Sequence, residues 1–248
     1  MKVRCRANFR SKPNTCQLIE VIDTKSDFNL SPYEDVYIIH TPLAECSFEN
    51  LSMSTHGYDV CLKALAQVVR GLDHIQQQGF MHRDIKPSNL LFCGLNGQAV
   101  VADYGQGTRQ PLSKDHNKGT IKYLAPEVLK LKEDEVLKRQ EDGSGQPYGR
   151  KVDVWSLGVA GFELFFRPPG SRDNPDLSRT IVHQRRLEML RRSALSVGPA
   201  LQKMLSWEVD ARPSITEVAS WDVWPKLPSI NEPTSSRKRS VDTATFDS

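Results

Sequence analysis

The sequence lacks any cysteine pattern that would indicate a metal site or a disulfide scaffold. Five cysteines are scattered among 248 residues, and no two are separated by the gap of about two to four residues that zinc half-sites use. An odd and dispersed set is also a poor disulfide framework. Scattered reduced thiols are typical of cytoplasmic or nuclear proteins, and we expect that location.

The sequence also lacks a secretory signal, a long apolar run and a charge excess of one sign. Met1–Arg10 is basic without an apolar stretch, which predicts no secretory signal. The most apolar segment, Val152–Phe166, is too short and too polar to cross a bilayer. With 33 basic and 30 acidic residues, the net charge is too balanced to indicate nucleic-acid binding. We therefore expect neither a membrane nor a nucleic acid as partner.

What is present is enough chain for one large domain or two lobes. Apolar residues in Val60–Ile75 recur every three or four positions, which predicts an amphipathic helix that stops near Gly79. Two short runs bracket Gly94–Gly97 and predict a hairpin. We expect further helices at Val154–Phe166, Thr180–Arg192, Pro199–Trp207 and Ser214–Trp221, and strands at Cys16–Ile22, Val36–Ile39, Leu90–Phe92 and Ala99–Val101.

Two segments have a different composition. Lys130–Arg150 is mostly charged and ends in glycine, serine and proline, which predicts an insertion near 130–150 with a short charged helix and a flexible loop. Residues 226–248 are rich in proline, serine and threonine and poor in apolar residues. That composition predicts a disordered tail.

An ordered set of short motifs carries the chemistry. The sharpest is His82-Arg83-Asp84-Ile85-Lys86-Pro87-Ser88-Asn89, which follows the amphipathic helix. The others, in chain order, are Asp103-Tyr104-Gly105, Gly119-Thr120, Ala125-Pro126-Glu127, Asp153 to Gly158, and Asp210 to Pro213. From about Cys16 to Pro225 this series resembles the C-terminal lobe of eukaryotic serine/threonine protein kinases. The resemblance implies an α+β, protein-kinase-like fold with a mainly helical C-lobe.

The resemblance also implies a catalytic set that uses ATP and Mg²⁺ on a protein substrate. Asp84 would orient the acceptor hydroxyl and take its proton, and Lys86 would stabilise the transferred phosphoryl group. Asn89 and Asp103 would hold Mg²⁺, a hard cation that prefers oxygen ligands. A lysine two residues after the aspartate is the family's mark of serine/threonine specificity.

Other positions carry over as structural support. Glu127 should form a buried ion pair with Arg212, and Asp153 should anchor the backbone of the catalytic turn. Thr120 resembles the threonine that bonds the catalytic aspartate and lysine. His82 resembles part of the family's regulatory spine, together with Tyr104.

Nucleotide-contacting positions follow from the same resemblance. Leu91 would lie beneath the adenine ring. His40 aligns with the gatekeeper and Thr41–Leu43 with the hinge, where Leu43 keeps the backbone donor and acceptor that an adenine uses.

Arg83, next to the catalytic aspartate, suggests regulation. A phosphate on the segment after Asp103 could pair with Arg83, and Ser113 is the best-placed acceptor. The alternative is that Ser113 is an unmodified, exposed loop residue.

The upstream half of a kinase is not recognisable. Residues 1–81 contain no G-x-G-x-x-G and no strand like V-A-I-K. We therefore expect residues 1–43 to be a remnant of the N-lobe (the end of the regulatory helix, two strands and the hinge) and 44–225 to be the C-lobe.

Three functions fit these observations. The first is a serine/threonine kinase seen as a truncated chain. The second is a catalytically impaired, kinase-like protein that binds a partner through its helical lobe. The third, a small-molecule phosphotransferase, is disfavoured because such enzymes generally lack the Ala-Pro-Glu motif and its arginine.

Overall fold

The structure is a computed structural model that describes residues 14–15, 20–23, 37–40, 43–93, 97–136, 146–166 and 178–227. Its strands are β1 (Glu20–Asp23), β2 (Tyr37–His40), β3 (Cys46–Ser47), β4 (Leu90–Cys93) and β5 (Gln98–Val101). Its α-helices are α2 (Met53–His56), α3 (Tyr58–Gln77), α4 (Pro126–Val136), α5 (Lys151–Phe166), α6 (Arg179–Arg192), α7 (Gly198–Met204) and α8 (Ile215–Ala219). Short 3₁₀ turns cover Pro87–Asn89 and Ile121–Tyr123.

Helix α3 confirms the predicted amphipathic helix and extends it by two residues at each end. One face is buried from Cys61 to Gln76 and packs under the β3–β4–β5 sheet. The helix is followed by Gly79, whose φ of 78° is a conformation that favours glycine. The chain therefore turns back at the predicted point and enters the catalytic motif.

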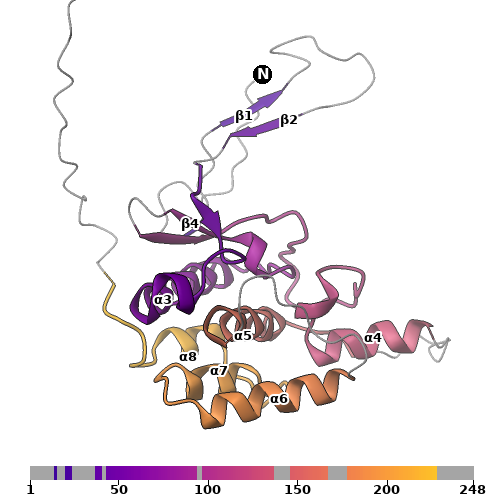
Figure 1. Ribbon diagram of the computed structural model, residues 1–248. Helices are drawn as coiled ribbons and strands as arrows, with labels where there is room; N and C mark the ends of the chain where they lie inside the picture. Colours follow the sequence, from indigo (N-terminus) through magenta and orange to yellow (C-terminus); the bar gives the residue numbers. More distant parts are fainter. Residues whose placement is uncertain are drawn as a thin grey trace, which may run out of the picture.

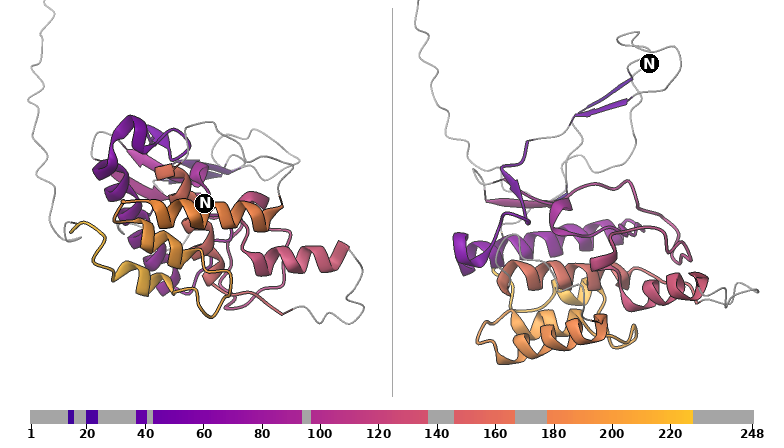
Figure 2. Two further views of the ribbon diagram at one scale, coloured as in Figure 1. Left: turned by 60° about the horizontal axis from the view of Figure 1, so that its bottom comes forward. Right: turned by 45° about the vertical axis from the view of Figure 1, so that its right-hand side comes forward.

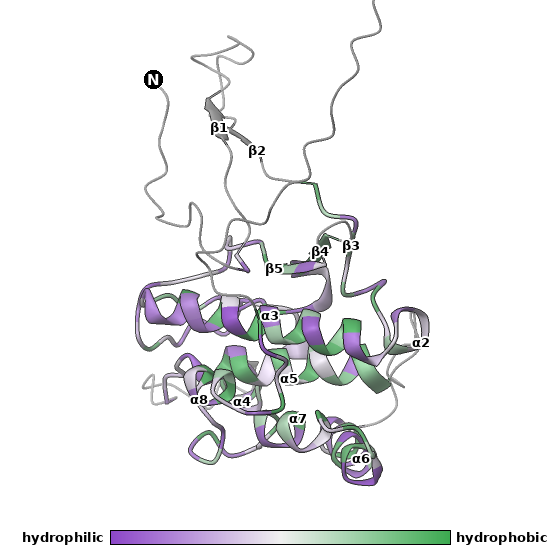
Figure 3. Cartoon of the chain, turned by 90° about the vertical axis from the view of Figure 1, so that its left-hand side faces the viewer, coloured by the Kyte–Doolittle hydropathy of each residue, from purple (hydrophilic) through white to green (hydrophobic). Residues whose placement is uncertain are grey.

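Helix α5 is the centre of the core. Thirteen of its 16 residues are buried, and a helix that is apolar all round is one enclosed by other elements. Figure 1 shows the sheet above α3, with α5 beneath it, and α6, α7 and α8 on the far side. The two further views agree (Figure 2), and α5 is coloured largely hydrophobic in Figure 3.

The predicted hairpin is confirmed in the three-stranded sheet β3–β4–β5. Strands β4 and β5 are antiparallel, with Leu90 opposite Val101 and Phe92 opposite Ala99. These four side chains are buried, whereas Leu91 is only half-buried. Because side chains alternate along a strand, Leu91 lies on the opposite face of the sheet from Leu90.

Several predicted boundaries were wrong. The strands expected at Cys16–Ile22 and Val36–Ile39 pair as β1 and β2, each of which ends one residue later than predicted. Residues 16–19 and 36, which include the predicted starts of both strands, lie outside the described residues. Helix α7 ends at Met204 rather than Trp207, since the N–H of Ser206 donates to Lys203, three residues back, instead of to the residue four back. The carbonyls of Ser206 and Trp207 accept hydrogen bonds from Arg212. Helix α8 keeps the predicted capping box of Ser214 and Glu217 but ends at Ala219.

The charged segment at 130–150 is partly the end of a longer helix. Helix α4 begins at Pro126, and proline is favoured in the first helical turn because it has no N–H to leave unpaired. The predicted loop at 137–145 lies outside the described residues. So do the expected end of the regulatory helix, within residues 1–13, and residues 228–248 of the expected tail. The division at residues 43 and 225 stays a prediction.

Within the described ranges, no helix is both long enough and apolar enough to cross a membrane.

Candidate active site

The turn His82–Asn89, between α3 and β4, carries the residues predicted to be catalytic (hereafter the catalytic turn) and is anchored by one buried carboxylate. The backbone N–H groups of His82 and Arg83 donate to the two oxygens of Asp153, at 2.9 and 2.8 Å. The amide of Gln76 donates to the same carboxylate. Burial raises the pKa of Asp153, and these donors oppose that rise. Arg83 has a φ of 68°, which is uncommon for a residue other than glycine, so Asp153 fixes a strained turn as predicted.

The carboxylate of Asp84 is held on both oxygens by neighbouring side chains. The hydroxyl of Thr120 donates to Oδ1 at 2.9 Å, and the ammonium of Lys86 lies 2.8 Å from Oδ2. The same ammonium donates to Thr120 at 3.1 Å. The structure therefore brings together the aspartate, lysine and threonine that the sequence assigned to one site.

Asn89 closes this network from the 3₁₀ turn. Its amide nitrogen donates to the backbone carbonyl of Asp84 at 2.8 Å and to the Asp84 carboxylate at 3.1 Å. Its backbone carbonyl accepts from Ala102, the residue before Asp103. With its nitrogen bound in this way, the amide presents its carbonyl oxygen as the remaining polar atom.

Asp103 lies two residues after the end of β5 and has an exposed side chain. Its φ of 60° is again unusual for a residue other than glycine, and one carboxylate oxygen accepts from the N–H of Gly105. Backbone strain of this kind concentrates at functional sites. Asn89 precedes β4 and Asp103 follows β5, so both lie at the open end of the β4–β5 hairpin. The hydrogen bond from Ala102 to Asn89 closes the hairpin at this end.

Asp103 and Asn89 fit a magnesium site that is completed by water and phosphate, rather than a metal site built from protein ligands alone. Within the described ranges there is no cluster of three histidine, cysteine or acidic residues. Mg²⁺ is commonly held by one or two protein oxygens, with water and phosphate oxygens completing the octahedron. A carboxylate and an amide oxygen fit that chemistry.

His82 and Tyr104 are in contact, as the resemblance implied. Their ring centroids are 5.3 Å apart, and the buried His82 ring bonds the carbonyl of Ala102 through Nε2. The Tyr104 hydroxyl donates to the carbonyl of Val101 at 2.8 Å. This polar group therefore has a hydrogen-bond partner.

Glu127 and Arg212 form the predicted ion pair. The guanidinium of Arg212 is fully buried and makes two hydrogen bonds to the carboxylate, at 2.7 and 3.1 Å. It also lies 5.1 Å from the centroid of Trp155. This pair joins the start of α4 to the turn before α8.

The positions expected to contact the nucleotide are less assembled. Leu91 lies on the outer face of the sheet, opposite Ser47 of β3 and two residues before Cys93. Leu43 is 95% exposed, so its side chain lines no enclosed site. The described part of His40 is its pairing with Glu20 across the β1–β2 ladder, and Thr41 and Pro42 lie outside the described residues.

Sequence reasoning missed an anchor on the hairpin. Asn14 donates from its amide to the carbonyl of Ala99, and its own carbonyl accepts from Val101, both at 3.0 Å. A Cβ on Gly71 would lie 2.3 Å from the Asn14 carbonyl oxygen. Gly71 stands within a strongly helical sequence pattern, and such a glycine was the signal that could have indicated this close approach.

Comparisons with known proteins agree with this geometry. A family model described as the protein kinase domain matches residues 3–223, which begins earlier than the resemblance at Cys16. An Aurora kinase of Eremothecium gossypii is 29% identical over 144 residues, covering 56% of this chain and 35% of the relative. The serine/threonine-protein kinase STE20 of the same organism is 30% identical over 152 residues, covering 60% of this chain and 14% of the relative.

A third relative is aligned along most of the chain. The SNF-related serine/threonine-protein kinase of Rattus norvegicus is 27% identical over 225 residues, which is 88% of this chain and 27% of the relative. The aligned part is thus about a third or less of each of these relatives. The motif order, the network around Asp84 and the domain match lead to one conclusion: the chain belongs to the eukaryotic serine/threonine protein kinase family.

Proposed function

We propose that the chain acts as a serine/threonine protein kinase, transferring the γ-phosphoryl group of ATP to a hydroxyl of a protein substrate. The observation that carries this proposal is the carboxylate of Asp84, held by Thr120 and Lys86 while Asn89 fixes the loop behind it. Phosphoryl transfer depends mainly on positioning and charge stabilisation. A carboxylate with a fixed direction, beside an ammonium group, supplies both.

The proposed step assigns each group one task. Asp84 accepts a hydrogen bond from the substrate hydroxyl and takes its proton as the oxygen–phosphorus bond forms and the bond to the ADP oxygen breaks. Lys86 stabilises the negative charge on the transferred phosphoryl group. Asn89 and Asp103 are the residues that would hold Mg²⁺, which neutralises phosphate charge when it is bound.

For the nucleotide itself, the support is the outer face of the β4 strand. Leu91 is half-buried there and would contact the adenine, with Leu43 contributing its backbone. Both assignments rest on the family resemblance. Three described cysteines (Cys46, Cys61 and Cys93) are free thiols, which supports a cytoplasmic or nuclear location.

The test is Mg·ATP-dependent phosphorylation of peptide libraries that contain only serine, threonine or tyrosine as acceptor. We expect transfer to serine and threonine, and a loss of about 10²- to 10⁴-fold in Asp84→Asn, the typical range for a general base. Asp222→Asn, at an exposed position, is the matched control and should behave as the native chain. If no transfer depends on Asp84, the chain has the non-catalytic, partner-binding role instead.

A further inference from the structure

Arg83 joins the catalytic turn to three points on residues 104–119, the segment that follows Asp103. Its Nε donates to the carbonyl of Gln106 at 2.6 Å. Its Nη1 lies 3.4 Å from the hydroxyl oxygen of Ser113 and 3.5 Å from the carboxylate of Asp115. The Arg83 side chain is 10% exposed, so its charge is largely removed from water. An enclosed guanidinium of this kind needs a negative partner.

The Asp115 carboxylate is oriented toward Arg83 by its own turn. One oxygen accepts from the N–H of Asn117 at 3.3 Å, the pattern of an Asx turn, while the other faces Arg83. The N–H of Asp115 donates to the Ser113 hydroxyl at 3.1 Å, and its carbonyl accepts from the hydroxyl of Tyr148. The carboxylate therefore has a fixed position.

Ser113, the phosphate acceptor predicted from the sequence, is only 7% exposed. The alternative was an unmodified and exposed loop serine, and its exposure was wrong. Its backbone pairs with Tyr148 through two hydrogen bonds of 2.9 Å, and its hydroxyl oxygen already faces Arg83 and the N–H of Asp115. A phosphate there would break these contacts and place about two further negative charges beside Asp115.

We propose that Asp115 is a positioning residue that supplies the negative charge opposite Arg83, so that the segment is held on the catalytic turn without phosphorylation of Ser113. The segment's far end touches the same turn: a Cβ on Gly119 would lie 2.6 Å from the carbonyl oxygen of Arg83, and Thr120 bonds Asp84. Loosening the contact with Asp115 therefore loosens the residues that orient Asp84. This inference rests on the proposed kinase function.

The decisive variant is Asp115→Asn, because an asparagine keeps the Asx turn and removes only the charge. For a partly exposed ion pair we expect kcat to fall about five-fold, with the KM for ATP unchanged. Backbone amides of residues 104–119 should exchange hydrogen faster than in the native chain. Asp222→Asn should change neither quantity. Adding Asp115→Asn to Arg83→Gln should have no further effect, since the two residues act as one unit.

Two arms separate Asp115 from a phosphorylation switch. Phosphatase treatment of the purified chain should leave kcat unchanged, and Ser113→Asp should lower it by placing a second carboxylate in a buried site. If phosphatase lowers kcat, or if Ser113→Asp raises it, Ser113 is the switch and the inference is overturned.

The hydrogen-exchange comparison is independent of activity. A native chain without Asp84-dependent transfer would refute the proposed function, yet the exchange rates would still decide the role of Asp115. Unchanged exchange over residues 104–119 in Asp115→Asn would overturn the inference in either case.

Discussion

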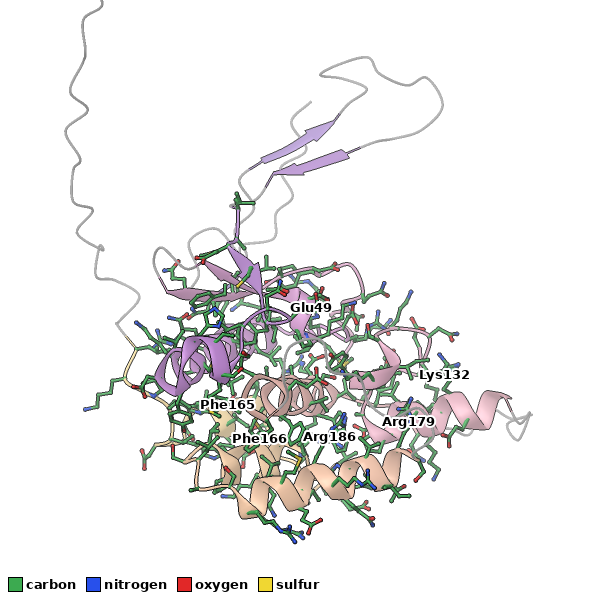
Figure 4. All side chains as sticks on the ribbon, in the orientation of Figure 1. Glu49, Lys132, Phe165, Phe166, Arg179 and Arg186 are labelled. Atoms are coloured by element: carbon green, nitrogen blue, oxygen red, sulfur yellow. The ribbon has the colours of Figure 1, made fainter. Side chains whose placement is uncertain are left out.

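Arg212 and Glu127, 85 positions apart in the sequence, are joined by two nearly parallel hydrogen bonds of 2.7 and 3.1 Å. The guanidinium also donates to the backbone carbonyls of Lys151, Ser206 and Trp207, so each side of the planar group has a partner. One side chain thus ties the starts of α4 and α5 to the turn before α8. A second contact joins two helices: the guanidinium of Arg186 in α6 lies 5.9 Å from the ring centroid of Phe162 in α5. Figure 4 labels Arg186 together with Phe165 and Phe166 at the end of α5.

Removing one member of the Arg212–Glu127 pair should destabilise the whole lobe. Glu127→Ala leaves a fully buried guanidinium without its counter-charge, and we expect the free energy of unfolding to fall by about 3 kcal/mol. Chemical denaturation measures this. The double variant Glu127→Ala with Arg212→Met should lose less than the sum of the two single changes. Additive losses would show that the pair is not coupled.

Thr120 should affect catalysis through a single hydroxyl. Thr120→Val keeps the shape but removes the group that lies between Asp84 and Lys86, and a lost hydrogen bond to a charged group predicts about a ten-fold or larger fall in kcat. Thr120→Ser keeps the hydroxyl and should retain most of the activity. Equal kcat values for the valine and serine variants would contradict this role.

Gly119 occupies a conformation that other residues rarely adopt. Its φ is +88°, and a Cβ there would lie 2.6 Å from the Arg83 carbonyl oxygen and 2.8 Å from a methyl group of Leu124. Gly119→Ala should therefore cost about 1–3 kcal/mol locally and displace the segment from the catalytic turn. Measurement of kcat and of the melting temperature should show both effects. Gly97→Ala is the control, because its φ is 58° but a Cβ there meets no atom within 4 Å: the melting temperature should fall less, and kcat should not change.

His183 should make the fold sensitive to mild acid. Its ring packs against Trp155 and Trp207, with ring centroids 5.1 and 5.2 Å away. Burial, followed by the charges of Arg186 and Arg212, lowers the pKa of His183 to about 4. The unfolded chain therefore binds a proton that the folded chain refuses between about pH 6.5 and pH 4. The free energy of unfolding should be highest above about pH 6.5. It should fall as the pH is lowered toward 4, by as much as about 3 kcal/mol.

His183→Phe keeps an aromatic ring packed against the two tryptophans and removes the titration. Denaturation across pH 4–7 should then show a shallower loss of stability than the native chain shows. If both chains lose stability in parallel, His183 is not the source of the acid sensitivity.

Local signals in the sequence determined most of the helical core and the catalytic turn. The spacing of apolar residues located α3, because burial of one face imposes that period, and Ser214 with Glu217 located the start of α8 through a cap completed within four residues. The hairpin β4–β5 followed from a short turn between two apolar runs. The motif around Asp84 could be predicted in the same way, since the contacts of Asp84 with Lys86 and Asn89 span only a few residues.

Only the tertiary structure decided the contacts that join distant segments. The anchoring of Asn14 on Ala99 and Val101 and the pairing of Ser113 with Tyr148 each depend on atoms supplied from tens of residues away. Local patterns cannot encode such partners, so Ser113 was misjudged as exposed and Asp115 was overlooked. The sequence determined which groups can perform the chemistry, and the packing of the lobe decided which charge lies opposite Arg83, because that requires two loops to meet on one buried guanidinium.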